Sequence, residues 1–360
     1  MNKVARRDWW FTGLLFITAA LIKIIAYNRS FVEIWYSQKW YVYISRFFRF
    51  LFGWLPFSFG DILYGAVFTW LLFQIIKLII ALFKKQYSKR SFINGCRKTI
   101  RAALIIYILF NILWGLNYDR RGIAYVLNLT MDNESGEDLN FLADSLLNKV
   151  NSARNELPDQ YDSLSADACY NKAISAYNNL SYQQSIFSYQ RRSIKSSLYG
   201  LLGNYLGYSG YYNPFTGEAQ INVKMPSFLL PYITCHEMAH QLGYASEDEA
   251  NFVGYLAAKS STDARVRYSV YFDLFNYANG ELYLYDSTKA RSNYKQLDTL
   301  VKKDIKAYRR FLLKYENPLE PLITSLYGTY LKANSQPEGI RTYSRVTALL
   351  IAYEKKYHRL

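Results

Sequence analysis

Three long apolar segments lie within the first 116 residues, and they restrict the possible fold more than any other feature of the chain. They cover residues 10–27, 62–83 and 100–116. Each approaches the ~20 residues that a helix needs to cross the hydrocarbon core of a bilayer. Trp10 and Trp114 stand near segment ends, where membrane proteins carry a belt of aromatic residues. We therefore predict a membrane anchor over residues 1–116, built from three transmembrane helices.

The positive charge of the chain is confined to this region. The formal net charge is +15. Residues 1–116 carry 16 Lys and Arg against 3 Asp and Glu, whereas residues 117–360 carry 27 against 25. A basic nucleic-acid-binding domain would concentrate its charge in the folded part. We expect no nucleic acid among the partners and expect the lipid bilayer instead.

The basic residues also predict orientation, because short loops rich in Lys and Arg stay in the cytoplasm. Lys3, Arg6 and Arg7 precede the first segment, and seven Lys and Arg lie in residues 84–101. With three spans, everything after Leu116 then lies outside the cytoplasm. Part of the aromatic-rich loop 28–60 is expected to lie flat in the membrane interface.

Residues 117–360 read as a mainly helical domain with a small β-hairpin or sheet. Residues 200–217 read as turns, and residues 219–223 alternate like a short strand. Cys169 and Cys235 could form a disulfide or remain buried thiols. Helical periodicity or capping residues predict helices over 139–150, 165–180, 226–240, 247–260, 264–278, 295–315 and 339–357.

One motif in this domain carries chemistry. The chain has 3 histidines, and two of them, His236 and His240, flank Glu237 in the pattern His-Glu-x-x-His. On a helix, residues four apart share one face, so both imidazoles converge on one point. Two imidazoles suit Zn²⁺ and leave room for a third ligand and water. Glu237 is then placed to accept a proton from that water as general base.

The third zinc ligand is expected on a second helix that begins after Gly243 and folds back. Glu247 shares a face with Ala250, Gly254 and Ala258, which we expect to pack on the metal helix. Glu249 is the alternative ligand, but it could also close a capping box with Ser246. We predict Glu247, with Asn251 one turn later as hydrogen-bond partner of a ligand histidine.

Five segments together resemble the domain-of-unknown-function 3810 family. They are residues 56–61, 212–219, 235–243, 247–252 and 330–334. The resemblance implies a bacterial envelope protein with a zinc site. The spacing from Glu247 to Asn251 is also similar to the Glu-x-x-x-Asp of gluzincin peptidases, with Asn where Asp is usual. This favours a zincin-like α+β catalytic domain after the three transmembrane helices.

We thus expect a multi-pass protein of the bacterial inner membrane whose extracytoplasmic, periplasmic domain hydrolyses peptide or protein substrates with zinc. Strand 219–223 would be an edge strand that pairs with an extended peptide, or a structural hairpin. Two other functions remain open at this stage. One is a non-catalytic envelope protein with a structural zinc site, and the other is a zinc amidase acting on cell-wall material.

Overall fold

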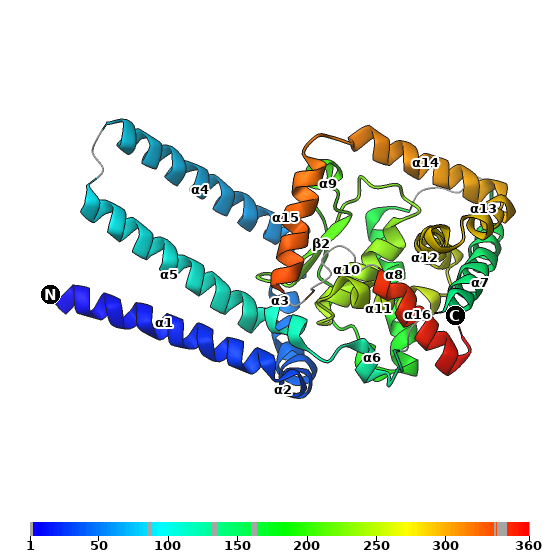
Figure 1. Ribbon diagram of the computed structural model, residues 1–360, viewed down its shortest axis with the longest axis horizontal. Helices are drawn as coiled ribbons and strands as arrows, with labels where there is room; N and C mark the ends of the chain where they lie inside the picture. The colour runs from blue at the N-terminus through cyan, green and yellow to red at the C-terminus, as the bar shows by residue number, and fades with distance from the viewer. Residues whose placement is uncertain are drawn as a thin grey trace.

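The computed structural model describes residues 3–84, 88–131, 135–159, 164–334, 336 and 344–359. It is mainly helical with one small sheet, as the sequence predicts. Three long helices project to one side of a compact body that contains the remaining elements (Figure 1). The start of α1 (Lys3–Tyr27), the end of α4 (Phe59–Phe83) and the start of α5 (Lys89–Leu113) lie at the far tip of these helices, away from the body.

The projecting helices are α1 (Lys3–Tyr27), α4 (Phe59–Phe83) and α5 (Lys89–Leu113). Among the described residues, two stretches are long and apolar enough to cross a membrane, Asp8–Tyr27 and Phe59–Phe83. The expected third span does not meet this description. It falls in α5, which ends at Leu113 and carries Arg97, Lys98 and Arg101 in its middle, so its apolar part is short.

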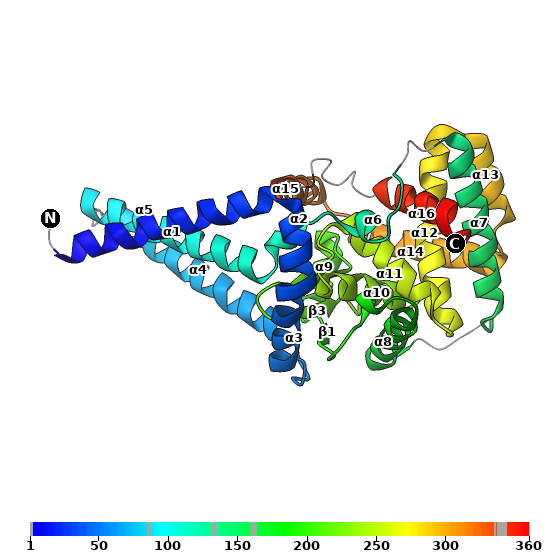
Figure 2. The ribbon, with the colours of Figure 1, turned by 90° about the horizontal axis from the view of Figure 1, so that it is seen from below.

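A continuous helical stretch crosses the body ends of α1, α4 and α5 (Figure 2). It consists of α2 (Arg29–Phe31), the π-helical segment η1 (Val32–Trp40) and α3 (Tyr41–Phe52). Its polar side faces inward: Ser45 and Arg49 are buried. Its aromatic side faces outward, with Tyr43, Phe47 and Phe50 exposed. This is the reverse of a helix on the surface of a water-soluble protein.

The core of the body is formed by helices that the sequence predicts, although their exact ends differ. α7 (Gly136–Asn155) packs along α12 (Ala264–Tyr285), and α8 (Ala166–Gln183) packs on α10 (Leu230–Gln241) and α11 (Glu247–Lys259). Apolar residues at helical spacing make this possible. Large buried side chains at these contacts include Leu142, Leu146, Tyr177, Tyr255 and Phe272.

The sheet has the order β1-β3-β2, with β1 (Ile194–Ser196) parallel and β2 (Gly210–Asn213) antiparallel to β3 (Glu218–Ile221). The expected strand 219–223 is therefore β3, but it is central, so the prediction of an edge strand is wrong. The stretch 200–217 also holds more than turns, because it contains α9 (Gly200–Leu206) and β2. β2 is the edge strand nearest the C-terminal part of α10.

Several boundaries differ from the prediction. The expected helix 295–315 is α14, which begins at Thr299, and residues 295–296 end the preceding helix α13. The expected helix 339–357 is described from Ser344, its first residues 339–343 lying outside the described part. Cys169 and Cys235 are free buried thiols. The other short elements and helices are η2 (Gly115–Asp119), α6 (Ile123–Val126), η3 (Ser185–Phe187), α13 (Ser287–Gln296), α14 (Thr299–Tyr315), α15 (Glu320–Ala333) and α16 (Ser344–Tyr357).

Candidate metal centre

The site is built where α10 and α11 cross. α10 ends just before Gly243, whose φ of 90° lets the chain reverse, as the sequence predicts. α11 then returns along α10 at very short distance. A Cβ atom on Gly254 would lie 3.1 Å from the backbone N and Cα of His236, so a residue without a side chain is needed there.

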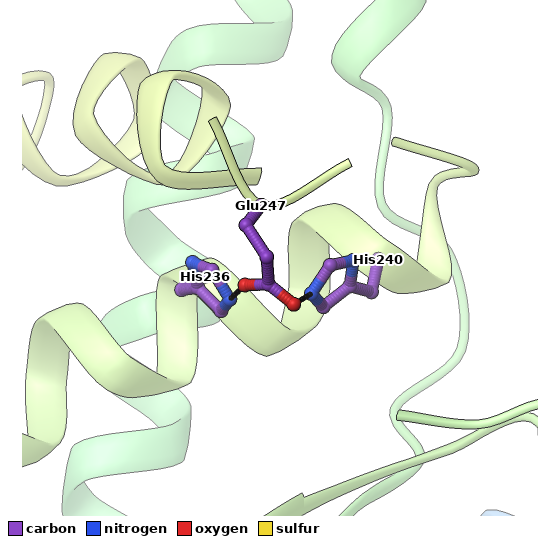
Figure 3. A group of neighbouring side chains, drawn as sticks. All are labelled: His236, His240 and Glu247. Carbon is purple, nitrogen blue, oxygen red and sulfur yellow. Dashed lines mark ion pairs between the residues drawn. The ribbon is translucent and has the colours of Figure 1, made fainter. Parts of the chain in front are cut away.

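This crossing brings His236, His240 and Glu247 together (Figure 3). Nε2 of His236 lies 3.2 Å from Glu247 Oε2, and Nε2 of His240 lies 3.9 Å from Glu247 Oε1. Atoms that bind one tetrahedral zinc ion at their usual distances lie roughly 3.4 Å apart. The three groups offer ligand atoms within 4.8 Å of one another, so small side-chain shifts would bring them to that separation. Two imidazoles and one carboxylate are the donor set of a zinc site with a position left for water.

Hydrogen bonds fix the orientation of both rings. Nδ1 of His236 donates to Oδ1 of Asn251 at 2.8 Å, and Nδ1 of His240 donates to the carbonyl of Tyr244 at 2.7 Å. Each acceptor requires the hydrogen on Nδ1, so Nε2 is the nitrogen turned toward Glu247. Asn251 thus has the contact that its sequence position predicts.

The electrostatics of the group favour a bound cation. Burial alone would lower the pKa of His236, but the Glu247 carboxylate raises that pKa to about 9. Burial alone would raise the pKa of Glu247, but the two histidines lower it to about 2. Burial lowers the pKa of His240 to about 4. The Glu247 carboxylate therefore favours a positive charge between itself and the histidines, where a metal ion would bind.

Glu237 lies beside this group but is not part of it. Its side chain is buried, and burial raises its pKa to about 8. Its Oε2 atom has no hydrogen-bond partner within the described residues. A Cβ atom on Gly210 would lie 2.6 Å from its Oε1, so a glycine in β2 makes room for this carboxylate. When it is ionised, this carboxylate has a free oxygen that can accept a proton from a bound water.

Glu249 is not near the histidines. Its Oε1 accepts a hydrogen bond from the backbone N–H of Ile123 at 2.6 Å, at the start of α6. The expected capping box is also wrong, because no Ser246 side-chain cap is formed on α11. A local sequence pattern could not reveal this, since the competing donor, Ile123, is 126 residues away in the chain.

Residues of the anchor region hold the C-terminal end of α10. The side chain of Ser45 donates to the carbonyl of Gln241 at 2.7 Å, and Trp114 donates to the carbonyl of His240 at 3.3 Å. The last carbonyls of a helix lack partners within that helix. The segment that precedes α4 and the segment that follows α5 therefore support the end of α10 directly.

Tyr327, on α15, is a site residue that the sequence analysis missed. Its hydroxyl donates to Glu247 Oε1 at 2.6 Å. With 35 tyrosines in the chain, no sequence signal distinguishes this one. α15 borders a cleft of about 1330 Å³ that contains His236, Glu237, His240 and Glu247 in its wall.

Comparison with known proteins gives one family. The family described as "Protein of unknown function (DUF3810)" matches residues 36–351, which is most of the chain. No curated protein and no solved structure matches the chain.

Proposed function

The chain belongs to the DUF3810 family of proteins of unknown function, and we propose that it is a membrane-anchored, zinc-dependent metallopeptidase. The observation that carries this proposal is the convergence of His236, His240 and Glu247 beside the buried carboxylate of Glu237. A structural zinc site is normally closed by four protein ligands, whereas a catalytic site keeps one position open. Three ligands in the wall of an open cleft support the catalytic alternative.

His236, His240 and Glu247 would hold the zinc ion. When bound, zinc supplies a Lewis acid that lowers the pKa of a water and polarises the substrate carbonyl. Glu237 accepts the proton of the attacking water on its free carboxylate oxygen and returns it to the leaving amine. Tyr327 is a candidate donor to the developing oxyanion, because its hydroxyl already reaches the ligand Glu247.

β2 is suited to orient the substrate. Asn222 donates from its backbone N–H to Ser209, which marks this pair as hydrogen-bonded in the antiparallel ladder. Hydrogen-bonded and non-bonded pairs alternate, so the backbone groups of Gly210 and Tyr212 face the open edge. An extended peptide could add there as a further strand beside Glu237. Edge strand, metal helix and glutamate-bearing helix together favour a zincin-like α+β catalytic domain.

We further propose three membrane spans, with α5 as the third. Its basic residues have partners: Arg97 lies 3.3 Å and Arg101 3.5 Å from the Asp8 carboxylate on α1. These pairs lie toward the helix ends remote from the body, where Lys and Arg favour the cytoplasm. The catalytic domain then lies on the periplasmic side of a bacterial inner membrane.

The test uses the full-length protein in detergent micelles and a random-sequence peptide mixture, with release of new amino groups as the readout. We expect about one zinc per chain by elemental analysis, hydrolysis that a chelator abolishes, and recovery on adding zinc. His236→Ala should lose both zinc and activity. His358→Ala, which changes the exposed histidine outside the site, is the matched control and should keep both. Zinc without hydrolysis would instead support a structural site.

A further inference from the structure

The cleft at the metal centre continues into the membrane anchor. Its wall includes His236 and Glu237 at one end and Ala103 and Ile106 of α5 at the other. Tyr64, near the start of α4, lines the cleft beside Tyr211 of β2. α5 packs on α1, whereas α4 stands apart from that pair (Figure 1). The cleft thus opens sideways between α4 and α5.

The length of α5 gives the depth of this opening. Ala103 precedes the end of α5 at Leu113 by ten residues, which corresponds to about 15 Å at ~1.5 Å per residue. The hydrocarbon core of a bilayer is ~30 Å thick. If α5 spans the membrane, the cleft is therefore open to lipid over roughly half of the thickness of the hydrocarbon core.

The lining changes character along the cleft. Ala103 and Ile106 are apolar, whereas Asn111 and Tyr118 lie nearer the metal site. A polypeptide that leaves the bilayer changes in the same direction. Inside the bilayer it presents apolar side chains to lipid, and outside it an extended backbone needs hydrogen-bond partners. A lipid tail would need only the apolar part.

The mouth of the cleft is surrounded by exposed leucines. α15 turns Leu322 and Leu326 outward, and Leu319 just before it is exposed as well. Ile323 and Tyr327 of α15 face the cleft. Leu201 and Leu202 of the neighbouring α9 are exposed as well. Large exposed apolar areas on a folded body mark contact with a membrane or partner.

We propose that the metal site acts on polypeptides anchored in the membrane, which enter the cleft sideways between α4 and α5 and present a bond just outside the bilayer. The apolar anchor of the substrate lies along Ala103 and Ile106, and the extended segment after it reaches β2 and Glu237. This inference rests on the proposed peptidase function and specifies its substrate class.

The experiment measures binding, so it does not depend on turnover. The zinc-loaded full chain carrying Glu237→Gln is reconstituted in liposomes with a fluorescent probe, a Leu/Ala helix of ~20 residues followed by a random-sequence tail. The tail alone and the helix alone serve as comparison probes. We expect the complete probe to bind at least about tenfold more tightly than either part, because the helix alone lacks the contacts of the tail and the tail alone lacks the contacts of the helix.

Two alanines on the same helix provide matched variants. Ala103→Trp fills the cleft wall and should weaken binding of the complete probe on the order of tenfold. Ala102→Trp adds the same ring at the adjacent exposed position, which does not line the cleft, and should leave binding unchanged. Zinc content in both variants verifies that the body is folded.

Equal binding of the tail alone would overturn the inference in favour of soluble peptides. If the helix alone bound as tightly as the complete probe, the opening would be a general apolar surface that lipid also covers, and the inference would be wrong. Equal effects of the two tryptophans would contradict the route between α4 and α5. If binding follows the expectation but the chain with Glu237 intact hydrolyses nothing, the peptidase function fails rather than the docking route.

Discussion

Glu247 and Glu249 are almost equally far from the two histidines in the sequence, but their side chains leave α11 in different directions. Glu247 lies on the face of α11 that crosses α10 at Gly254, and it reaches both histidines. Glu249 points away and bonds Ile123 instead. Helical phase therefore ranks the two candidates correctly, whereas the hydrogen-bond partner of Glu249 lies far away in the chain.

We expect Glu247→Ala to lose zinc because it removes one of three ligand groups. Glu249→Ala should keep zinc and lower the free energy of unfolding by about 1–3 kcal/mol, since the N–H of Ile123 loses its acceptor. Elemental analysis and thermal unfolding of the two variants measure both effects. Zinc loss in Glu249→Ala with zinc retained in Glu247→Ala would reverse the assignment.

Tyr327 allows a second test at this scale. Tyr327→Phe removes one hydroxyl and keeps the ring, so the zinc content should stay near that of the wild type. If the hydroxyl stabilises the oxyanion, kcat should fall by roughly 10²–10³-fold with little change in KM. A kcat equal to that of the wild type at equal zinc content would show that the hydroxyl only braces Glu247.

Among the elements, those with strong local signals are predicted well. α7 and α8 follow from apolar spacing, and the end of α10 follows from Gly243. The start of α11 is predicted at the right residue, although Ser246 does not form the expected cap. β2 and α9 are missed because seven-residue or shorter elements inside a Gly- and Tyr-rich stretch have no resolvable period. α15 is also absent from the predicted helices.

Contacts between the anchor and the body could not be predicted either, because they join residues far apart in the chain. Glu218 accepts hydrogen bonds from the N–H groups of Phe59 and Gly60 at 3.1 and 2.5 Å, at the start of α4. A Cβ atom on Gly60 would lie 2.6 Å from Asn213. Two segments that carry the family resemblance, 56–61 and 212–219, therefore touch, and one helix start is docked on the sheet.

The ion pair between Glu33 and Arg120 links η1 to the body and gives a prediction for pH. Both side chains are buried, at 0% and 5% exposure. Burial alone would raise the pKa of Glu33, but the Arg120 guanidinium lowers it below the usual range. The folded state therefore binds this proton less readily than the unfolded state, so the stabilisation is complete above a pH of about 4.5 and is lost as pH falls further.

Glu33→Gln leaves the Arg120 charge buried without a counter-ion, which should cost about 3–5 kcal/mol at neutral pH. The unfolding temperature in detergent should drop on the order of 10 °C. As pH falls through the folded-state pKa of Glu33, the wild type loses the same interaction, and the two unfolding temperatures should converge. If the difference between the two unfolding temperatures stayed constant from neutral to acid pH, this role of the ion pair would be contradicted.

For the whole molecule, the arrangement of the three projecting helices predicts a topology. A reporter enzyme that is active only outside the cytoplasm should be silent when fused after Ser88 and active when fused after Leu360. Only α5 and the body separate these two positions. The same signal at both positions would mean that α5 does not cross the membrane, and the two-span alternative would then apply.

The central claim is that Glu237 acts as general base at a zinc site, and Glu237→Gln tests it most directly. The substitution keeps the shape of the side chain and removes its ability to accept the proton. We expect zinc content equal to that of the wild type and a loss of peptide turnover of roughly 10²–10⁴-fold. Full turnover by Glu237→Gln, under conditions where the wild type is active, would contradict the account.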